Sequence, residues 1–138
     1  MGTEIPVGYR PSESEPFMSE RQREYFRCKL MGWKEDILRE TRETIQNLQA
    51  ETTPHADLAD RASSEAERQL ELRTRDRQRK LIAKIDAALR RIEDGSYGFC
   101  DETGEPISLK RLDARPIATL SVEAQERHEQ RERVYRDD

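Results

Sequence analysis

Two aspartates, Asp57 and Asp60, stand three residues apart just after Pro54. At this spacing two side chains lie on one face of a helix, so both carboxylates can face the same partner. Aspartates also cap helix starts and favour the positive end of the helix dipole. The two roles are compatible, since one aspartate can cap while the other faces outward. No adjacent nucleophile or glycine-rich phosphate loop accompanies the pair, so the pattern predicts a protein that is not an enzyme.

Cys100 is a second candidate for chemistry, because a cysteine can bind a metal or react with oxidants. A structural zinc ion takes about four Cys or His ligands in paired spacing. The paired positions here hold Thr103, Ser121 and Ala124, so a single sulfur remains. We therefore expect no zinc, and we interpret Cys100 as a free thiol in a module that packing and hydrogen bonds stabilise. A role in sensing oxidants stays open, provided that the thiol is exposed and its pKa is lowered.

A basic cluster in the segment 73–84 allows two interpretations. The first is a solvated helix face whose charges pair with neighbours four residues away. In the second, Lys84 and Arg115 converge on an anion such as a phosphorylated nucleotide. The cluster consists of Arg73, Arg75, Arg77, Arg79, Lys80 and Lys84.

Two long helices must position these residues. Apolar residues recur at steps of three and four from Ser19, a plausible N-cap, to about Gln49, and again from about Asp57 to Asp94. The run 50–56 with Pro54 breaks the pattern between them. Similar lengths and a short connection predict an antiparallel coiled coil whose tip is held less tightly than its base. The expected seam is Phe26, Leu30, Trp33, Ile37, Thr44 and Leu48 against Ala62, Ala66, Leu70, Leu81, Ile85, Ala88 or Leu89, and Ile92.

The remaining segments are shorter. Gly95 and Ser96 end the second helix, and a turn at 103–106 flanked by apolar alternation predicts a compact module with two short strands. Ser121 can cap a last helix that runs to about Tyr135. The predicted organisation is a flexible tail over 1–16, a hairpin over 17–94 with its tip at 50–62, a module over 95–120, and a C-terminal helix and tail over 121–138.

The composition limits the classes of function. Among 138 residues, 33% are hydrophobic and 39% are charged, a mixture that suits long solvated helices better than a round globule. The net charge of −4 does not favour binding to DNA phosphates. No stretch approaches the roughly 20 apolar residues of a membrane span, and no secretion signal precedes the first helix. We therefore expect a cytoplasmic protein with free thiols.

The chain resembles the DksA family of bacterial transcription factors in four segments: FMSERQREYFRCKLMGWKEDI, DLADRAS, ELRTRDRQRKLIAKID and YGFCDETGEPISLKRLDARPIATL. The resemblance extends from Phe17 to about Glu126, and the pairing of the D-x-x-D-x-A tip with RLDARP is its most specific part. It implies a mainly α fold: a long antiparallel coiled-coil hairpin, a small globular zinc-finger-like module and a C-terminal helix.

The resemblance also implies a function. Members of the family bind bacterial RNA polymerase rather than specific DNA, and their coiled coil enters the secondary channel while the module and C-terminal helix grip the outside. The tip destabilises promoter complexes, which inhibits ribosomal RNA promoters and activates some amino-acid biosynthesis promoters. The alarmone guanosine tetraphosphate (ppGpp) strengthens this effect in the stringent response.

Matching positions transfer these roles to the chain. The tip residues that act near the polymerase active centre are Asp57, Asp60 and Ala62; Asp60 carries the main carboxylate, and Ala62 allows close approach. By its position, Arg77 is the residue that contacts the polymerase rim. The residues that bind ppGpp together with polymerase are Leu81, Lys84 and Arg115.

The chain departs from the family pattern at two places. The four zinc-ligand positions hold Cys100, Thr103, Ser121 and Ala124, which indicates a zinc-independent variant with vestigial ligand positions and no cofactor. The basic residue usual after the fourth position is Gln125, so one phosphate contact of ppGpp is in doubt.

Two other functions compete with this one. A structural coiled-coil adaptor would dimerise through its seam, but the arginine-interrupted stripe argues against an extended intermolecular seam and favours a monomer. A related channel factor that stimulates transcript cleavage also carries acids at its tip, but it lacks the DLADRA and RLDARP segments.

Overall fold

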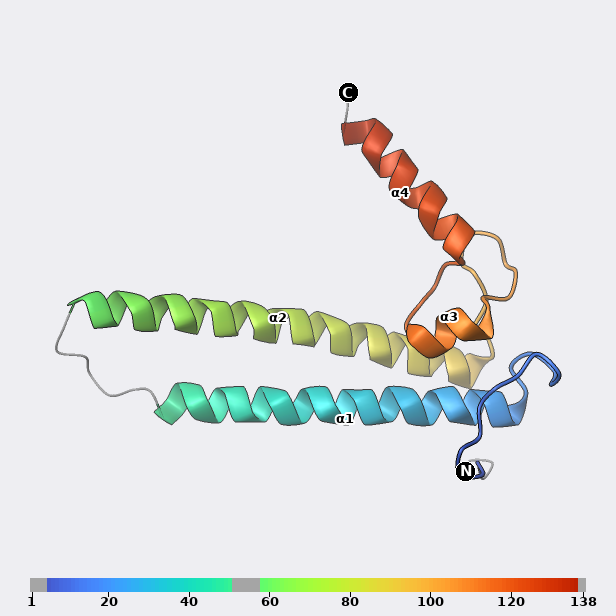
Figure 1. The fold of residues 1–138 in the computed structure, drawn as a ribbon, viewed down its shortest axis with the longest axis horizontal. Coiled ribbons are helices and arrows are strands. Elements are labelled where there is room, and N and C mark those ends of the chain that lie inside the picture. The colour runs from blue at the N-terminus through green and yellow to red at the C-terminus, as the bar shows by residue number, and fades with distance from the viewer. Residues whose placement is uncertain (1–4, 51–57, 137–138) are drawn as a thin grey trace. The chain divides into compact units, whose positions relative to one another are not determined.

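The computed structural model describes residues 5–50 and 58–136, with the side chains of 5–47 and 61–134. Within these residues the chain is mainly α-helical, as the sequence predicts (Figure 1). The predicted strands around the turn at 103–106 do not form; in their place is an isolated bridge between Phe99 and Pro106. The helices are α1 Glu20–Ala50, α2 Leu58–Asp94, α3 Leu109–Ala114 and α4 Val122–Arg136.

Local signals explain where the two long helices begin and end. Ser19 caps α1 as predicted: its Oγ accepts a hydrogen bond from the Gln22 N–H at 3.3 Å. At the end of α2, Gly95 has a φ of +84°, a left-handed conformation that glycine adopts without strain. This bend lets the N–H groups of Ser96 and Tyr97 donate to the Arg91 carbonyl at 2.9 and 3.1 Å. One of the carbonyl groups left open by the last turn of α2, that of Arg91, thereby gains two donors.

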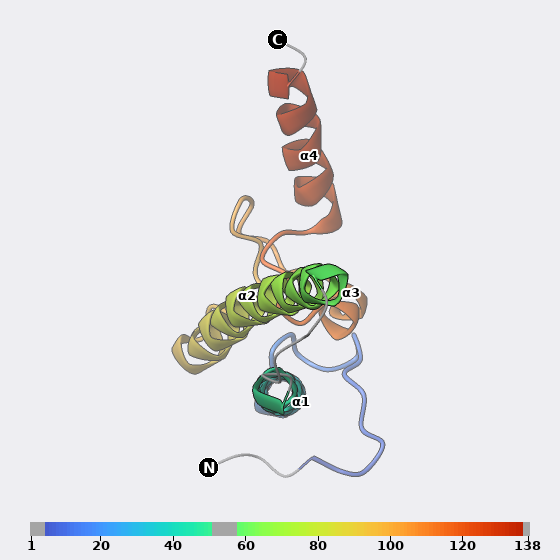
Figure 2. The same ribbon diagram turned by 90° about the vertical axis from the view of Figure 1, so that its left-hand side faces the viewer.

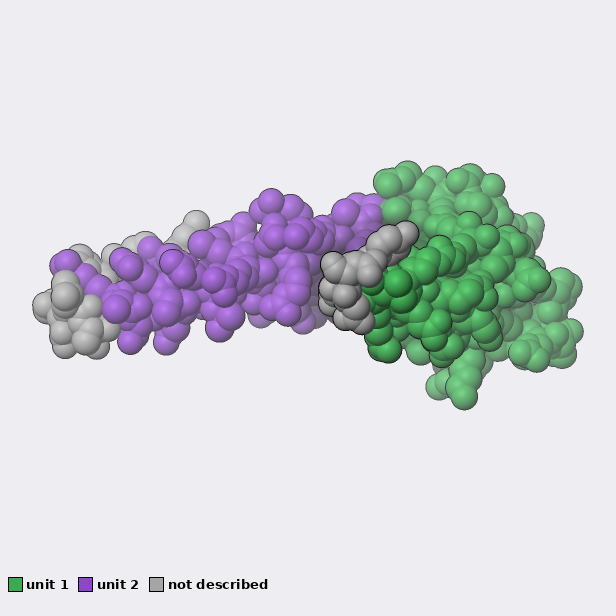
Figure 3. Space-filling model, turned by 90° about the horizontal axis from the view of Figure 1, so that it is seen from above, with its two compact units in different colours: residues 1–30, 87–138 green, residues 31–86 purple. Residues whose placement is uncertain are grey.

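The chain forms two compact units, Met31–Asp86 and Met1–Leu30 with Ala87–Asp138 (Figure 3). Within the Met31–Asp86 unit, which is unit 2 in Figure 3, α1 and α2 lie side by side and run in opposite directions (Figures 1 and 2). Lys34 Nζ contacts Asp86 Oδ1 at 2.7 Å, and Thr41 Oγ1 donates to Gln78 Oε1 at 2.9 Å. The predicted antiparallel pairing is therefore confirmed, with polar contacts between the helices as well as apolar ones.

The apolar seam of the Met31–Asp86 unit is shorter than predicted. Ile37 and Ile85 are buried, and among the described residues of this unit no other side chain is. Ala62 and Ala66 are exposed, and Leu70 keeps 59% of its surface accessible, so the predicted seam is wrong at these three positions. The polar segment between Leu70 and Leu81 explains this, since arginines cannot be buried between two helices without partners.

The unit formed by residues 1–30 and 87–138, unit 1 in Figure 3, contains most of the apolar core. Phe26 of α1 packs its ring against Tyr97 at a centroid distance of 5.6 Å. The Tyr97 hydroxyl donates to the Pro116 carbonyl at 2.7 Å, which satisfies its polar end inside the core. Here the module covers one end of α1 and of α2. The other buried hydrophobic residues of this unit are Leu30, Ala88, Ile92, Cys100, Ile107, Leu112, Ala118 and Ala124.

The segment before α1 also belongs to this unit, although the sequence predicts a flexible tail over 1–16. The fully buried Gln22 donates from Nε2 to the Ser12 carbonyl at 3.1 Å. Tyr9 donates from its hydroxyl to Glu15 at 2.7 Å, and the Phe17 ring meets Phe99 edge-on at 5.4 Å. One glutamine thus fixes the path of the chain that enters the first helix.

None of the helices in the described part of the chain combines the length and apolar character needed to cross a membrane.

Gly98 should be intolerant of a side chain. Its φ is +91°, and a Cβ at this position would lie 3.1 Å from Phe17 and 3.3 Å from Met18. We expect Gly98→Ala to lower the free energy of unfolding by about 1–3 kcal/mol, because backbone strain and crowding add. Urea denaturation followed by circular dichroism measures the change.

Gly104→Ala is the matched control. Gly104 also has a positive φ, of +75°, but nothing lies within 4 Å of its Cβ position. Both variants carry the strain of the backbone, so the difference between them reports the contact with Phe17 and Met18. Equal losses of stability would show that this contact does not matter.

Candidate functional site

The predicted tip lies at the start of α2. Asp57 lies outside the described residues, and only the backbone of Asp60, in the first turn of α2, is described. Ala62 is exposed on the same helix. The structure therefore places Asp60 and Ala62 on one helix at the predicted turn, and the direction of the carboxylates stays a prediction.

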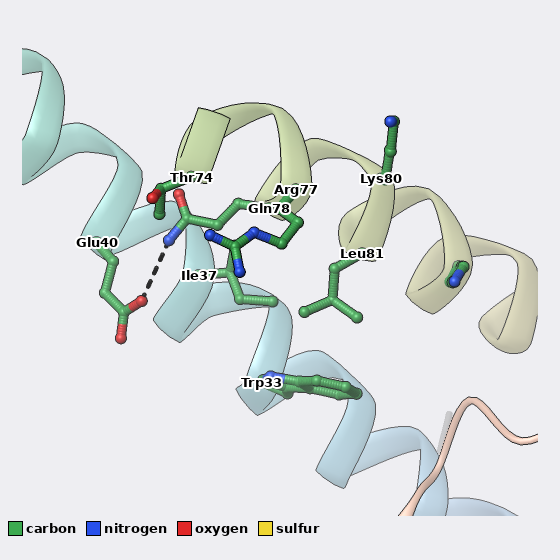
Figure 4. Close-up of a pocket in the computed structure, with 9 residues that line it drawn as sticks. Trp33, Ile37, Glu40, Thr74, Arg77, Gln78, Lys80 and Leu81 are labelled. Atoms are coloured by element: carbon green, nitrogen blue, oxygen red, sulfur yellow. Dashed lines mark hydrogen bonds between the residues drawn. The ribbon is translucent and has the colours of Figure 1, made fainter. Parts of the chain in front are cut away.

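A groove between α1 and α2 in the Met31–Asp86 unit contains three of the other predicted residues: Arg77, Leu81 and Lys84 (Figure 4). Its volume is about 550 Å³. Trp33 and Leu81, both half-buried, and the buried Ile37 supply its apolar surface. Figure 4 shows the indole of Trp33 lying across the groove from Leu81. The remaining lining residues are Glu40, Thr74, Gln78 and Lys80.

Some of the charged side chains around this groove have ion-pair or hydrogen-bond partners, and others form no ion pair with a described residue. Lys80 pairs with Asp76 at 3.2 Å, and Glu40 accepts a hydrogen bond from Gln78 Nε2 at 3.4 Å. Arg77 and Lys84 form no ion pair with any described residue. An apolar surface beside two exposed, unpaired cations suits a ligand with an aromatic part and anionic groups.

Arg115 belongs to the other compact unit. Its backbone N–H donates to the Arg111 carbonyl at 2.7 Å and closes α3, while its side chain is exposed. Gln125 is half-buried on α4 and donates to Glu129 at 3.2 Å. At the position where a basic residue is usual, the chain therefore has a neutral amide engaged within its own helix.

Cys100 lies in the core of the module, with 2% of its surface accessible. Burial raises the pKa of its thiol, but hydrogen bonds from the Thr103 side chain and from the backbone N–H groups of Ser121, Thr103 and Glu102 outweigh it and lower the pKa to about 6. The Ser121 N–H lies 3.4 Å from Sγ. The thiol has the lowered pKa that oxidant sensing requires but not the exposure, so the geometry does not favour that role.

Two other positions of the predicted set, Thr103 and Ser121, hydrogen-bond to the same sulfur, and Ala124 hydrogen-bonds to Ser121. Ser121 caps α4 as predicted, because its Oγ accepts a hydrogen bond from the Ala124 N–H at 3.2 Å. Thr103 Oγ1 also accepts one from the Glu105 N–H at 3.2 Å. The Ala124 methyl group is fully buried. The structure thus links Thr103 and Ser121 to the sulfur directly, and Ala124 to it through Ser121.

Sequence reasoning missed two features of the site. The apolar stripe predicts Trp33 in the seam, whereas the structure has it lining the groove. The sequence signal for this is a bulky indole on a stripe that arginines interrupt. Lys29 and Asp113, which bind α1 to α3, are 84 residues apart, so no local pattern could pair them.

Two family models match the chain. Residues 22–92 match the N-terminal domain of the DnaK suppressor protein DksA, and residues 95–130 match the prokaryotic dksA/traR C4-type zinc finger. Together they cover both long helices and the module. The chain belongs to the DksA family.

Individual relatives agree with this assignment. The RNA polymerase-binding transcription factor DksA of Caulobacter vibrioides is 76% identical over 94% of this chain and 92% of its own length. The protein of that name in Escherichia coli K12 is 39% identical over 91% of this chain and 83% of its own length. The solved structure of transcription factor DksA2 from Pseudomonas aeruginosa has a TM-score of 0.80 at 44% identity, covering 87% of this chain and 95% of that one.

The C4-type description of the second model points toward zinc and away from the expectation of a zinc-free module. The side chains of this member do not fit the ion, however. Zinc prefers cysteine and histidine ligands, whereas the four positions supply one sulfur, two hydroxyl groups and a methyl group. No group of three or more His, Cys, Asp or Glu in the described residues is arranged to hold a metal.

The thiol of Cys100 should make stability depend on pH. Its folded pKa of about 6 lies below its ordinary value of 9.0, so between these values the unfolded chain binds a proton that the folded chain has lost. The contribution is therefore complete above pH 9 and is lost as the pH falls to about 6. We expect the stability of the intact protein, relative to Cys100→Ser, to rise with pH across this window.

Urea midpoints at several pH values test this expectation. Cys28→Ser is the control, since partial desolvation and the hydrogen bond to Glu24 shift the pKa of the Cys28 thiol upward, the direction opposite to that of Cys100. Parallel curves for the intact protein and Cys100→Ser would contradict a thiolate at position 100.

Proposed function

We propose that this protein binds bacterial RNA polymerase and regulates transcription by inserting the tip of its hairpin into the secondary channel. The observation that carries the proposal is the 76% identity, over 94% of the chain, to a relative named as an RNA polymerase-binding transcription factor. The paired helices of the Met31–Asp86 unit support it, because two helices side by side form a narrow element that a channel can admit.

The tip acts near the polymerase active centre. Asp60 supplies the main carboxylate with Asp57 beside it, and the small Ala62 allows a close approach. By destabilising promoter complexes, the protein inhibits ribosomal RNA promoters and activates some amino-acid biosynthesis promoters. The exposure of Ala62 on α2 supports this role. The action is regulatory rather than enzymatic, because the polymerase performs the chemistry.

The groove of the Met31–Asp86 unit contributes to regulation by ppGpp. Leu81 and Lys84 contact the alarmone together with polymerase, and Arg115 contributes from the other unit. The unpaired Lys84 supports this proposal, since an uncommitted ammonium group binds phosphate well. Gln125 lacks the charge for a further phosphate contact, so we expect a weaker response to ppGpp than a basic residue would give.

The proposal extends to the contact with the channel rim, the oligomeric state and the independence from DNA and zinc. Arg77 contacts the rim of the channel, where its exposed and unpaired guanidinium supports a polar interface. The protein acts as a cytoplasmic monomer without specific contacts to DNA. It works without zinc, because one sulfur with two hydroxyl groups cannot replace four thiolates.

Asp60→Asn should abolish regulation. We expect the intact protein to inhibit transcription from a ribosomal RNA promoter by purified bacterial polymerase with zinc chelated throughout, and Asp60→Asn to lose most of this inhibition, because a neutral amide replaces the tip charge. The measurement is the yield of transcript with and without ppGpp. Glu65→Gln, which removes an exposed carboxylate further along α2, is the control and should inhibit normally.

Absence of inhibition by the intact protein would overturn the proposal and favour the adaptor. Sedimentation of the same sample then decides whether it dimerises. Stimulated transcript cleavage in a stalled complex would instead indicate the related channel factor.

Lys84→Ala should weaken the response to ppGpp selectively. A hydrogen bond to a charged group contributes about 1.5–3 kcal/mol, so we expect the half-maximal ppGpp concentration to rise roughly tenfold or more. Arg79→Ala, an exposed cation of α2 that does not line the groove, is the control. Equal half-maximal ppGpp concentrations for the two variants would show that Lys84 does not bind the alarmone.

A further inference from the structure

Three polar side chains join α1 to α3 in the unit that contains the module. Lys29 Nζ donates to Asp113 Oδ1 and to the Asp113 carbonyl oxygen, both at 2.7 Å. The Tyr25 hydroxyl donates to the same carboxylate oxygen at 2.5 Å. One ammonium group thus holds both the side chain and the backbone of a single α3 residue, a geometry that fixes the residue more tightly than an ordinary ion pair.

The electrostatics of this cluster agree with its geometry. The Lys29 ammonium and the Tyr25 hydroxyl hold the pKa of the Asp113 carboxyl below its usual value, against the effect of burial. The side chains of Lys29 and Asp113 are 37% and 35% exposed, and ion pairs this accessible to solvent contribute little to stability. The cluster therefore fixes the orientation of Asp113 more than it contributes to the stability of the fold.

Arg115 follows Asp113 by two residues and closes α3. Its backbone N–H donates to the Arg111 carbonyl at 2.7 Å, and Arg111 Nε donates to the Leu120 carbonyl at 2.8 Å. On its other side, the Pro116 carbonyl accepts the Tyr97 hydroxyl at 2.7 Å. The backbone around Arg115 is thus anchored before and after it, whereas its guanidinium is exposed.

We propose that Tyr25, Lys29 and Asp113 form a positioning cluster that holds the end of α3, and with it the Arg115 guanidinium, in the direction needed to bind a phosphate group. The inference rests on the proposed function, in which Arg115 contacts ppGpp. It adds three residues that do not touch the ligand and act through Arg115. A planar guanidinium binds phosphate best along fixed directions, so a shift of α3 weakens binding without removing a charge from the site.

Lys29→Met tests the cluster, because it removes the ammonium and keeps an unbranched side chain. The readout is inhibition of a ribosomal RNA promoter by the full chain with polymerase across a ppGpp titration. We expect the half-maximal ppGpp concentration to rise roughly tenfold, the scale of one weakened charge-assisted hydrogen bond, while inhibition without ppGpp is unchanged. Lys29→Arg, which keeps a donor cation, should recover much of the response.

Lys34→Met is the matched control. Lys34 also lies on α1 and pairs with an aspartate at 2.7 Å, with side chains 29% and 37% exposed, but its partner Asp86 is on α2. We expect it to leave the ppGpp titration unchanged. Tyr25→Phe, which removes a single hydroxyl, is a second and milder variant that should shift the titration in the same direction as Lys29→Met.

The outcomes separate the inference from the function it rests on. An intact protein that inhibits without responding to ppGpp overturns the alarmone site and the positioning role together. A normal response of the intact protein with equal titrations for Lys29→Met, Tyr25→Phe and Lys34→Met overturns the positioning role alone. Equal losses with and without ppGpp also overturn it, since they indicate a general structural role, which urea midpoints would register independently.

Discussion

Two helices that pack only against each other bury one narrow stripe apiece, so the apolar core of this protein depends on where a third layer covers them. That layer is the module. Where it packs on α1, Phe26 and Leu30 are fully buried, and Tyr97 fills the space beside Phe26. Among the described residues of the Met31–Asp86 unit, Ile37 and Ile85 alone are buried. The rest of that seam must be polar or exposed.

The groove is a consequence of the same constraint. Beyond the fully buried positions of the seam, the facing helix covers Trp33 and Leu81 on one side only. Both side chains are therefore half-buried. Hydrogen bonds such as Thr41 to Gln78 then hold the helices together, because a polar pair tolerates contact with water. The features that weaken the hairpin as a core therefore make it suitable for a ligand: an incompletely covered indole lies beside cations without partners.

Periodicity and breakers predicted the long helices well, since Ser19 and Gly95 act within a few residues of the ends they define. The same periodicity failed at Leu70, because a stripe shows which face a side chain occupies but not whether a partner covers that face. The helix α3 was missed because six residues carry less than two turns of pattern. The contact of Lys29 with Asp113 joins segments far apart in sequence, and only the packed module brings them together. Local rules thus identified the candidate residues, whereas their surroundings depended on tertiary packing.

Hydrogen bonds and packing hold the module together around Cys100. Ser121 donates its N–H to the Cys100 sulfur and caps α4 with its hydroxyl, so a single residue joins the thiol to the start of a helix. The buried methyl of Ala124 fills space where no ligand atom exists. Hydrogen bonds to one sulfur contribute little individually, so packing of the surrounding core also has to stabilise the module. Since that core, through Tyr97, is also the layer that covers Phe26, the module and the start of α1 must be stable together or not at all.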